Sequence, residues 1–409
     1  PAVLVLALAL LAMVSSGDAS HAASTPKAGD AVPGRYIVVL RQGSDPEAFA
    51  AAHGLAADVV YRHALRGFAA GLSAKAAAAL RTDPNVSLVE PDRVFTIADQ
   101  TLPTGADRID ADRNATADID GSGPDLDIDI AVIDTGVNQT HPDLNVAGGA
   151  NFSGPLFCSN GSGSIEDGNG HGSHVSGTAA ARDNTTGFVG VAPGARIWGV
   201  RVLNAQGFGF TSCIIRGIDW VTAHADTIEV ANMSLGGPPS AATCAAIASS
   251  VAAGVIYAVA AGNESHSAFY SSPANCPDVI SVSAVADYNG APGGGAAPTC
   301  ANQGADDSLA SFSNFGYPVD IAAPGVCIAS TYKNGGYAIA SGTSMASPHV
   351  AGAVADFLLA TGYSGSASGP SVVTAMTAAG YTTPQGGPCG FSGDPDAFHE
   401  PLVWLGAPC

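Results

Sequence analysis

Residues 342–352 read Gly-Thr-Ser-Met-Ala-Ser-Pro-His-Val-Ala-Gly, and they predict how the rest of the chain is organised. A tight glycine turn precedes a serine and an apolar run to about residue 360, so Ser344 is expected at a helix N-terminus. Free backbone N–H groups and the helix dipole favour negative charge at such a position. Ser344 is therefore either a nucleophile, if the chain supplies a base, or an ordinary helix cap.

Segments with strand and helix character alternate from about residue 100 onward. Apolar strands are expected at 128–133, 196–202, 228–233, 255–260 and 279–284, and helices at 171–181, 211–225, 241–253 and 344–360. This alternation predicts an α/β domain with a mainly parallel sheet covered by helices. In such sheets the ligand site lies at the carboxyl ends of the strands, and Asp134 directly follows one of them.

A smaller unit precedes this domain. Strands are expected at 36–40, 68–72 and 86–89 and helices at 45–53 and 74–82, in a βαββαβ-like, ferredoxin-like α+β order. A unit of about 60 residues is marginally stable alone, so we expect it to lean on the domain that follows. We place it at 35–97, with a linker over 98–103.

Composition narrows the class of protein. With 46% hydrophobic and only 12% charged residues, the chain builds an extensive core. The formal charge of −20 opposes binding to nucleic acid, because no basic patch offsets the acidic field.

The first residues resemble a secretion signal. An apolar run over 2–12 is too short for a membrane span but suits a signal-peptide core, with cleavage expected after Ala22. The run lacks an initiator Met and a basic start, so we interpret 1–22 as an N-terminally truncated signal peptide; an apolar anchor is the alternative. Because no later run is long enough to cross a bilayer, we expect a secreted product that leaves the membrane after signal removal.

The chain has eight cysteines, and an even number in a secreted chain predicts disulfides. None has the close spacing of a zinc site. Eight cysteines allow 105 connectivities. On nearness in the sequence alone, we predict the pairs Cys244–Cys276, Cys300–Cys327, Cys389–Cys409 and Cys158–Cys213.

Three motifs carry chemistry. Asp134 lies at a strand exit, His171 at a helix start within the stretch Asp-Gly-Asn-Gly-His-Gly-Ser-His, and Ser344 in the opening segment. Singly, each has an ordinary explanation as a turn or cap residue. Together they supply an orienting carboxylate, a base and a nucleophile.

In order and in flanking sequence these motifs resemble the subtilase family of serine proteases, of the subtilisin and proteinase K kind. The resemblance covers nearly the whole chain and implies a three-layer subtilisin-like α/β fold over 100–409. It also implies that Ser344 attacks, that His171 acts as base and then acid, and that Asp134 holds the imidazole. Asn263 would donate its side-chain amide to the oxyanion, together with the Ser344 backbone N–H. His174 and His349 are interpreted as structural.

The resemblance also implies the substrate-binding residues. An edge strand that pairs with the substrate backbone and two walls of the P1 pocket are expected from Gly207, Phe208, Gly209, Ser234, Leu235, Gly236, Ala260, Ala261 and Gly262. Small walls without a charged floor favour apolar or bulky P1 residues. Phe208 departs from the family, where small or polar residues are frequent, so preference beyond P1 stays open.

By the same resemblance, the unit at 35–97 is similar to an inhibitor I9-type propeptide, which lays its last strand, 94–99, into the cleft until autoprocessing near 98–100. Its alternative is an ordinary accessory domain. Calcium is the one expected cofactor, a structural ion held by Gln100, Asp143 and Asn184, since oxygen ligands suit this ion.

The sequence therefore predicts a secreted, monomeric serine endopeptidase that is made as a zymogen and acts on polypeptides. Two alternatives remain. A silent relative that only binds peptides is opposed by the complete set of Asp134, His171, Asn263 and Ser344. A lipase or esterase is opposed by the absence of a G-x-S-x-G elbow around Ser344 and by the order of the three residues.

Overall fold

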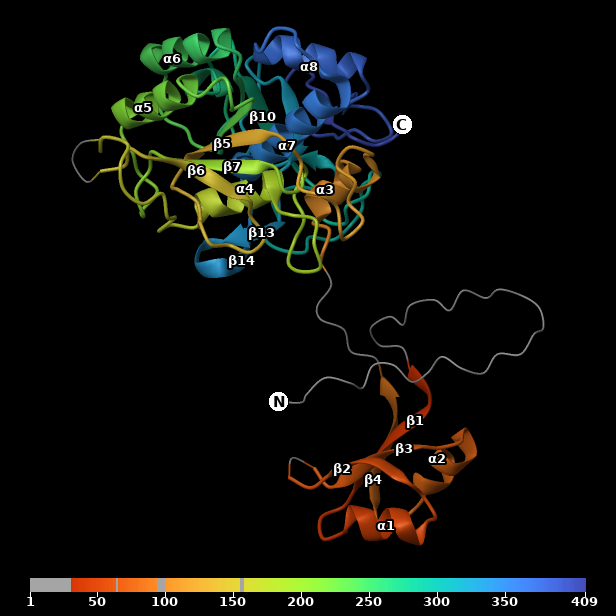
Figure 1. Ribbon diagram of the computed structural model, residues 1–409. Coiled ribbons are helices and arrows are strands. Elements are labelled where there is room, and N and C mark those ends of the chain that lie inside the picture. Colours follow the sequence, from red (N-terminus) through yellow and green to blue (C-terminus); the bar gives the residue numbers. More distant parts are fainter. Residues whose placement is uncertain (1–30, 64, 94–99, 155–157) are drawn as a thin grey trace, which may run out of the picture. The chain divides into compact units, whose positions relative to one another are not determined.

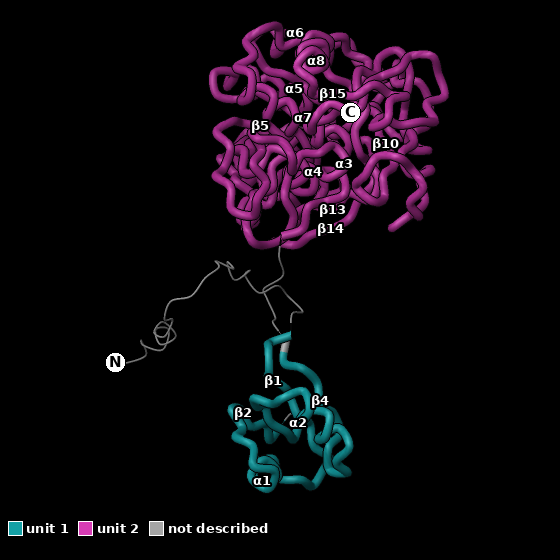
Figure 2. Tube along the Cα trace, turned by 90° about the vertical axis from the view of Figure 1, so that its right-hand side faces the viewer, with its two compact units in different colours: residues 1–97 teal, residues 98–409 magenta. Residues whose placement is uncertain are grey.

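The computed structural model describes residues 31–63, 65–93, 100–154 and 158–409, which form two compact units, 1–97 and 98–409 (Figures 1 and 2). The predicted signal peptide, the strand at 94–99 and its processing site near 98–100 lie outside the described residues, apart from Gln100. Among the described helices, none is long and apolar enough to cross a membrane.

The first unit is a four-stranded antiparallel sheet in the order β2-β3-β1-β4, with two short helices. Its elements are β1 (Ala31–Leu40), α1 (Pro46–Ala52), β2 (Ala57–Tyr61), β3 (Gly67–Gly71), α2 (Ala74–Leu80) and β4 (Val86–Arg93). Asp45 and Ser73 cap the helices by accepting from the N–H groups of Ala48 and Ala76. The expected α+β order is confirmed, with β2 as a strand to which the sequence assigned no range.

The second unit is built on a ten-stranded sheet that is mainly parallel, in the order β15-β16-β12-β10-β9-β8-β5-β7-β6, with β11 paired to β10. Its larger strands are β5 (Asp129–Asp134), β6 (Val146–Asn151), β7 (Arg196–Arg201), β8 (Val230–Met233), β9 (Ile256–Ala260), β10 (Ile280–Ala286) and β12 (Ile321–Pro324). The shorter ones are β11 (Ser308–Leu309), β15 (Thr382–Thr383) and β16 (Leu402–Val403). All six residues of β5 are buried, as expected for a central strand covered on both faces.

Helices cover both faces of this sheet (Figure 1). They are α3 (Thr104–Arg108), α4 (His171–Ala180), α5 (Thr211–Thr222), α6 (Ala241–Ala252), α7 (Thr343–Thr361) and α8 (Gly369–Ala378). Side chains of α4 and α7 belong to one buried cluster and those of α5 and α6 to another, with the sheet between them. The predicted three-layer α/β fold is confirmed.

A separate two-stranded hairpin, β13 (Ile328–Tyr332) and β14 (Gly336–Ala340), packs on α4. All four predicted disulfides are present, with Cα–Cα distances of 5.1 to 6.0 Å. The bond between Cys158 and Cys213 ties a loop to the first turn of α5, and the bond between Cys389 and Cys409 closes the C-terminal segment.

Candidate active site

The end of strand β5 and the start of helix α4 bring Asp134 and His171 together. Asp134 is the last residue of β5, and His171 is the first residue of α4. Gly170 precedes the histidine with φ 110°, and a Cβ there would lie 2.2 Å from the Tyr332 ring, so only glycine permits this entry into the helix. His171 Nδ1 lies 2.8 Å from Asp134 Oδ1.

This contact sets the ionisation of the imidazole. Burial lowers the pKa of His171, but the charge and hydrogen bond of Asp134 outweigh burial, so the pKa lies above its ordinary value of 6.5. Asp134 is fully buried, and its Oδ1 also accepts from the Thr135 N–H at 2.7 Å. The arrangement stabilises an imidazolium and holds Nδ1 protonated toward the carboxylate.

A second carboxylate, Asp167, organises the start of α4. Its Oδ1 accepts from the Gly170 N–H and the Thr135 hydroxyl, and its Oδ2 accepts from the Ser173 N–H and hydroxyl, at 2.7 to 2.9 Å. Asp167 thus satisfies N–H groups that the helix leaves without partners. Sequence reasoning assigned it no role, although an aspartate four residues before His171 is a capping signal.

Ser344 lies in the first turn of α7, as predicted. Pro348, four residues later, has no N–H and leaves the Ser344 carbonyl without its helical donor. That carbonyl accepts instead from the Ser234 hydroxyl at 2.8 Å. The Ser344 hydroxyl donates to the Ser234 carbonyl at 3.3 Å, and among the described residues it makes no hydrogen bond to His171.

Thr343 holds the side chain of Asn263. Its Oδ1 accepts from the backbone N–H of Thr343 at 2.8 Å and from the Thr343 hydroxyl at 3.0 Å. Asn263 and Ser344 line the same cleft, and the Asn263 amide oxygen is occupied by Thr343. Thr343 is therefore a positioning residue that sequence reasoning did not single out.

Two clefts adjoin these side chains. One, of about 310 Å³, contains His171 together with Gly207, Phe208 and Gly209. The other, of about 530 Å³, contains Ser344, Asn263, Ala260 and Gly262. Ser234, Leu235 and Gly236 line both, so the two clefts share one wall.

One expected wall residue does not line either cleft. Ala261 is fully buried, and its carbonyl accepts from Asn314 Nδ2 at 2.9 Å. Glu264 and His266 line the second cleft instead, with Glu264 Oε2 4.0 Å from His266 Nε2. A carboxylate from the loop after Asn263 is therefore part of the lining of this cleft.

The other two histidines near the motifs are buried in backbone contacts. His174 Nε2 lies 3.0 Å from the Ile328 carbonyl, and His349 Nδ1 lies 2.8 Å from the Met345 carbonyl. Burial lowers the pKa of both imidazoles to about 4, so both are neutral at physiological pH.

The three residues expected to hold calcium are brought together. The Asn184 N–H donates to Gln100 Oε1 and Asn184 Nδ2 donates to Asp143 Oδ1, both at 2.9 Å. Asp143 is fully buried, and its Oδ2 accepts from the Tyr337 hydroxyl at 2.7 Å. One carboxylate and two side-chain amides, with the Arg182 carbonyl beside Gln100, supply the kind of oxygen ligands that a hard cation prefers, and Gln100 Oε1 and both Asp143 carboxylate oxygens accept hydrogen bonds from protein donors. Among the described residues, no cluster of three or more His, Cys, Asp or Glu could hold a metal.

Residues 126–379 match the family described as the Subtilase family, and residues 35–98 match Peptidase inhibitor I9. The chain belongs to the subtilase family and is a serine-type, subtilisin-like endopeptidase made with an inhibitor propeptide.

Similar proteins agree with this assignment. Subtilisin NAT of Bacillus subtilis subsp. natto is 40% identical over 291 residues, which cover 70% of this chain and 69% of that protein. Alkaline serine exoprotease A of Vibrio alginolyticus is 38% identical, over 80% of this chain and 61% of that protein. Among solved structures, this chain is similar to the crystal structure of a cold adapted subtilisin-like serine proteinase, with 33% sequence identity and a TM-score of 0.57. The match covers 74% of this chain and 98% of that chain.

Proposed function

We propose that Ser344, His171 and Asp134 form the catalytic triad of this endopeptidase. The observation that carries the proposal is the 2.8 Å contact between His171 Nδ1 and buried Asp134 Oδ1, on the same edge of the sheet as the helix start that bears Ser344. His171 Nε2 takes the proton of the Ser344 hydroxyl as the oxygen attacks the scissile carbonyl. It then gives the proton to the leaving amine, and an acyl-enzyme remains. A water molecule then attacks this ester while His171 accepts a proton from the water. His171 returns that proton to the Ser344 oxygen as the acyl product leaves.

Asn263 Nδ2 and the Ser344 N–H are proposed to bind the oxyanion. The hold of Thr343 on the amide oxygen supports this role, because it presets the direction of the donor before charge develops. Removing one such donor costs about 10²–10³ in kcat, a magnitude established for this kind of site in a subtilisin.

Substrate is proposed to bind as an added strand. Residues Gly207–Gly209 and Ser234–Gly236 both line the 310 Å³ cleft, and an extended peptide is proposed to pair with the backbone of both segments. The 530 Å³ cleft takes the P1 side chain and suits an apolar or bulky residue, with Glu264 and His266 at its polar side.

A structural calcium ion is proposed at Gln100, Asp143 and Asn184. It would tie the segment at Gln100 to the loop after α4. Chelation should therefore shorten the half-life of the enzyme on heating, whereas Asp143→Asn should make that half-life insensitive to the chelator. Thermal inactivation that chelation leaves unchanged in the unsubstituted protein would count against the ion.

The remaining features of the proposal concern biosynthesis. We propose a signal peptide at 1–22, a propeptide at 35–97 that inhibits until autoprocessing near 98–100, and a secreted, monomeric catalytic domain at 100–409. Four disulfides in the catalytic unit support an oxidising compartment.

The deciding experiment compares the full chain with its Ser344→Ala form under oxidising conditions with calcium. The unsubstituted chain should release its propeptide and hydrolyse casein, and Ser344→Ala should do neither. A processed and active Ser344→Ala protein would refute the role of this serine. A peptide-library digest of the active enzyme then measures the P1 preference.

A further inference from the structure

A large cleft in the described part of the chain lies apart from Ser344 and His171. It has a volume of about 1180 Å³ and shares no lining residue with the two catalytic clefts. Its walls are helix α8 and the segment 382–401, most of which follows the part of the chain that matches the subtilase family.

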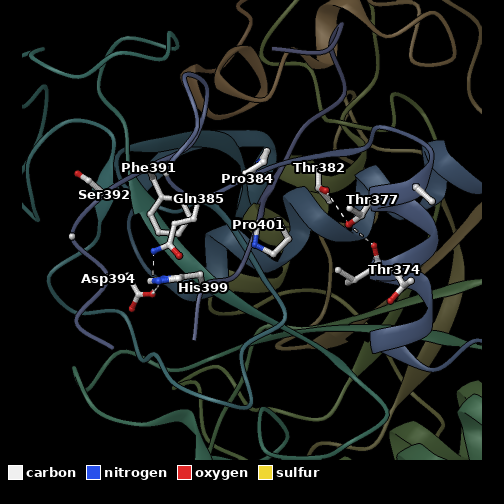
Figure 3. A pocket seen from close by; sticks show the side chains of 14 residues that line it. Thr374, Thr377, Thr382, Pro384, Gln385, Phe391, Ser392, Asp394, His399 and Pro401 are labelled. Atoms are coloured by element: carbon white, nitrogen blue, oxygen red, sulfur yellow. Dashed lines mark hydrogen bonds and ion pairs between the residues drawn. The ribbon is translucent and has the colours of Figure 1, made fainter. Parts of the chain in front are cut away.

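One end of the cleft is rich in hydrogen-bond acceptors. Gln385 Nε2 donates to Asp394 Oδ2 at 3.0 Å, and the Asp394 side chain is only 2% exposed (Figure 3). Gln385 Oε1 is buried and has no partner among the described residues. The Nδ1 atom of the exposed His399 imidazole lies 3.8 Å from Asp394 Oδ2, and none of the described lining residues is lysine or arginine. This end thus has a buried carboxylate and a spare amide oxygen but no permanent positive charge.

At the other end, the hydroxyls of the threonines already donate within the protein. The hydroxyls of Thr374 and Thr377 donate to the carbonyls of Pro370 and Val373 on their own helix, at 2.7 and 2.8 Å. The Thr382 hydroxyl donates to Thr377 Oγ1 at 3.0 Å. These hydrogens are used within the protein, so the threonines present methyl groups and oxygen lone pairs to the cleft.

Apolar surface joins the two ends. Pro384 and Pro401 lie between the acceptor-rich end and the threonines, and Phe391 lies at the acceptor-rich end (Figure 3). A cleft of this size is large enough for a small organic molecule, and burying an apolar body on these rings is favourable. An anion would meet the acceptors without a permanent counter-charge and is disfavoured.

We infer that this cleft binds an organic monocation, whose ammonium group reaches Asp394 and Gln385 while its apolar body lies on Phe391, Pro384 and Pro401. The ammonium donates to the carboxylate and to the unpartnered amide oxygen, and its charge complements the buried carboxylate. The inference does not depend on the catalytic roles proposed above.

The test measures binding of three probes to the full chain carrying Ser344→Ala, by titration calorimetry. The probes are phenylbutylamine, its acid analogue phenylbutyrate and its neutral analogue phenylbutanol, which share one apolar body. The amine should bind saturably and more tightly than the other two. Asp394→Asn should weaken amine binding about tenfold or more, because it removes the charge from the hydrogen bond.

Three further variants make the result decisive. Ala378→Trp fills the cleft from an exposed helix position and should abolish binding even if Asp394→Asn folds poorly. Asp226→Asn makes the same change of charge on a distant exposed loop and should leave binding unchanged. Glu264→Gln removes the carboxylate of the catalytic cleft. Equal binding of the amine and the acid would overturn the inference. The inference would also fail if Glu264→Gln abolished binding of the amine while Asp394→Asn and Ala378→Trp left it intact.

Discussion

The end of strand β5 and the middle of helix α7 each bury one aspartate completely, with opposite surroundings. Asp134 Oδ1 accepts from His171 Nδ1 and from the Thr135 N–H. In Asp356, neither carboxylate oxygen has a partner among the described residues, and burial raises its pKa to about 7. A buried carboxylate can orient a neighbouring side chain where donors meet one of its oxygens, as at Asp134 Oδ1, whereas burial without any donor favours the neutral acid, as at Asp356.

The largest expected effect comes from removing the charge that has partners. Asp134→Asn should lower kcat/KM by about 10⁴-fold, because an amide no longer holds the imidazole in the productive tautomer. Hydrolysis of a chromogenic peptide measures this change. Asp356→Asn is the matched control, and it should leave kcat/KM within about twofold, since its side chain touches no reacting group. Similar losses in both variants would contradict the contrast.

The next effect comes from replacing the carboxylate that has no partners. Asp356→Leu should stabilise the protein by about 1–4 kcal/mol near pH 8, because an apolar side chain replaces an uncompensated acid in an apolar core. Urea unfolding in the Ser344→Ala background measures the change without self-digestion. A Leu variant that unfolds at lower urea than its parent would show that Asp356 has compensation in solution.

The pH dependence of this stabilisation sharpens the comparison. The pKa of Asp356 is raised from 3.8 to about 7 on folding, so between these values the native chain binds more protons than the unfolded chain, and stability falls as pH rises. The advantage of Asp356→Leu should therefore be small at pH 4, grow up to about pH 7 and then level off. Unfolding curves at several pH values test this, and an advantage that is constant with pH would contradict it.

The smallest expected effect is a shift in a pH profile. Catalysis needs neutral His171, whose pKa is raised above 6.5 chiefly by Asp134 against the effect of burial. The acid limb of kcat/KM should therefore have its midpoint above pH 6.5, and Asp134→Asn should move that midpoint down. An unchanged midpoint in the variant would mean that another group controls the limb.

Much of the fold follows from local pattern. Mostly apolar runs such as 128–133 predict strands buried on both faces, and the structure has a strand at Asp129–Asp134. The helix expected at 344–360 is present at Thr343–Thr361. Strands β12 and β16 were not predicted, because short runs at Ile321–Pro324 and Leu402–Val403 lack a pattern that distinguishes strand from loop.

The sequence by itself determined the family and the predicted triad, because Asp134, His171 and Ser344 each lie in a short motif of contiguous residues. It also predicted the disulfide pairs, because the paired cysteines are near one another in the sequence. Only the tertiary structure decided the partners of these residues. Ser234 bonds to the Ser344 carbonyl across 110 positions of the chain, and whether Asp356 meets a donor depends on elements that pack around α7. Such contacts join residues that are far apart in the chain, and no local sequence pattern predicts which of them will meet. For the same reason, the acceptor-rich cleft beside α8 could be found only in the folded structure.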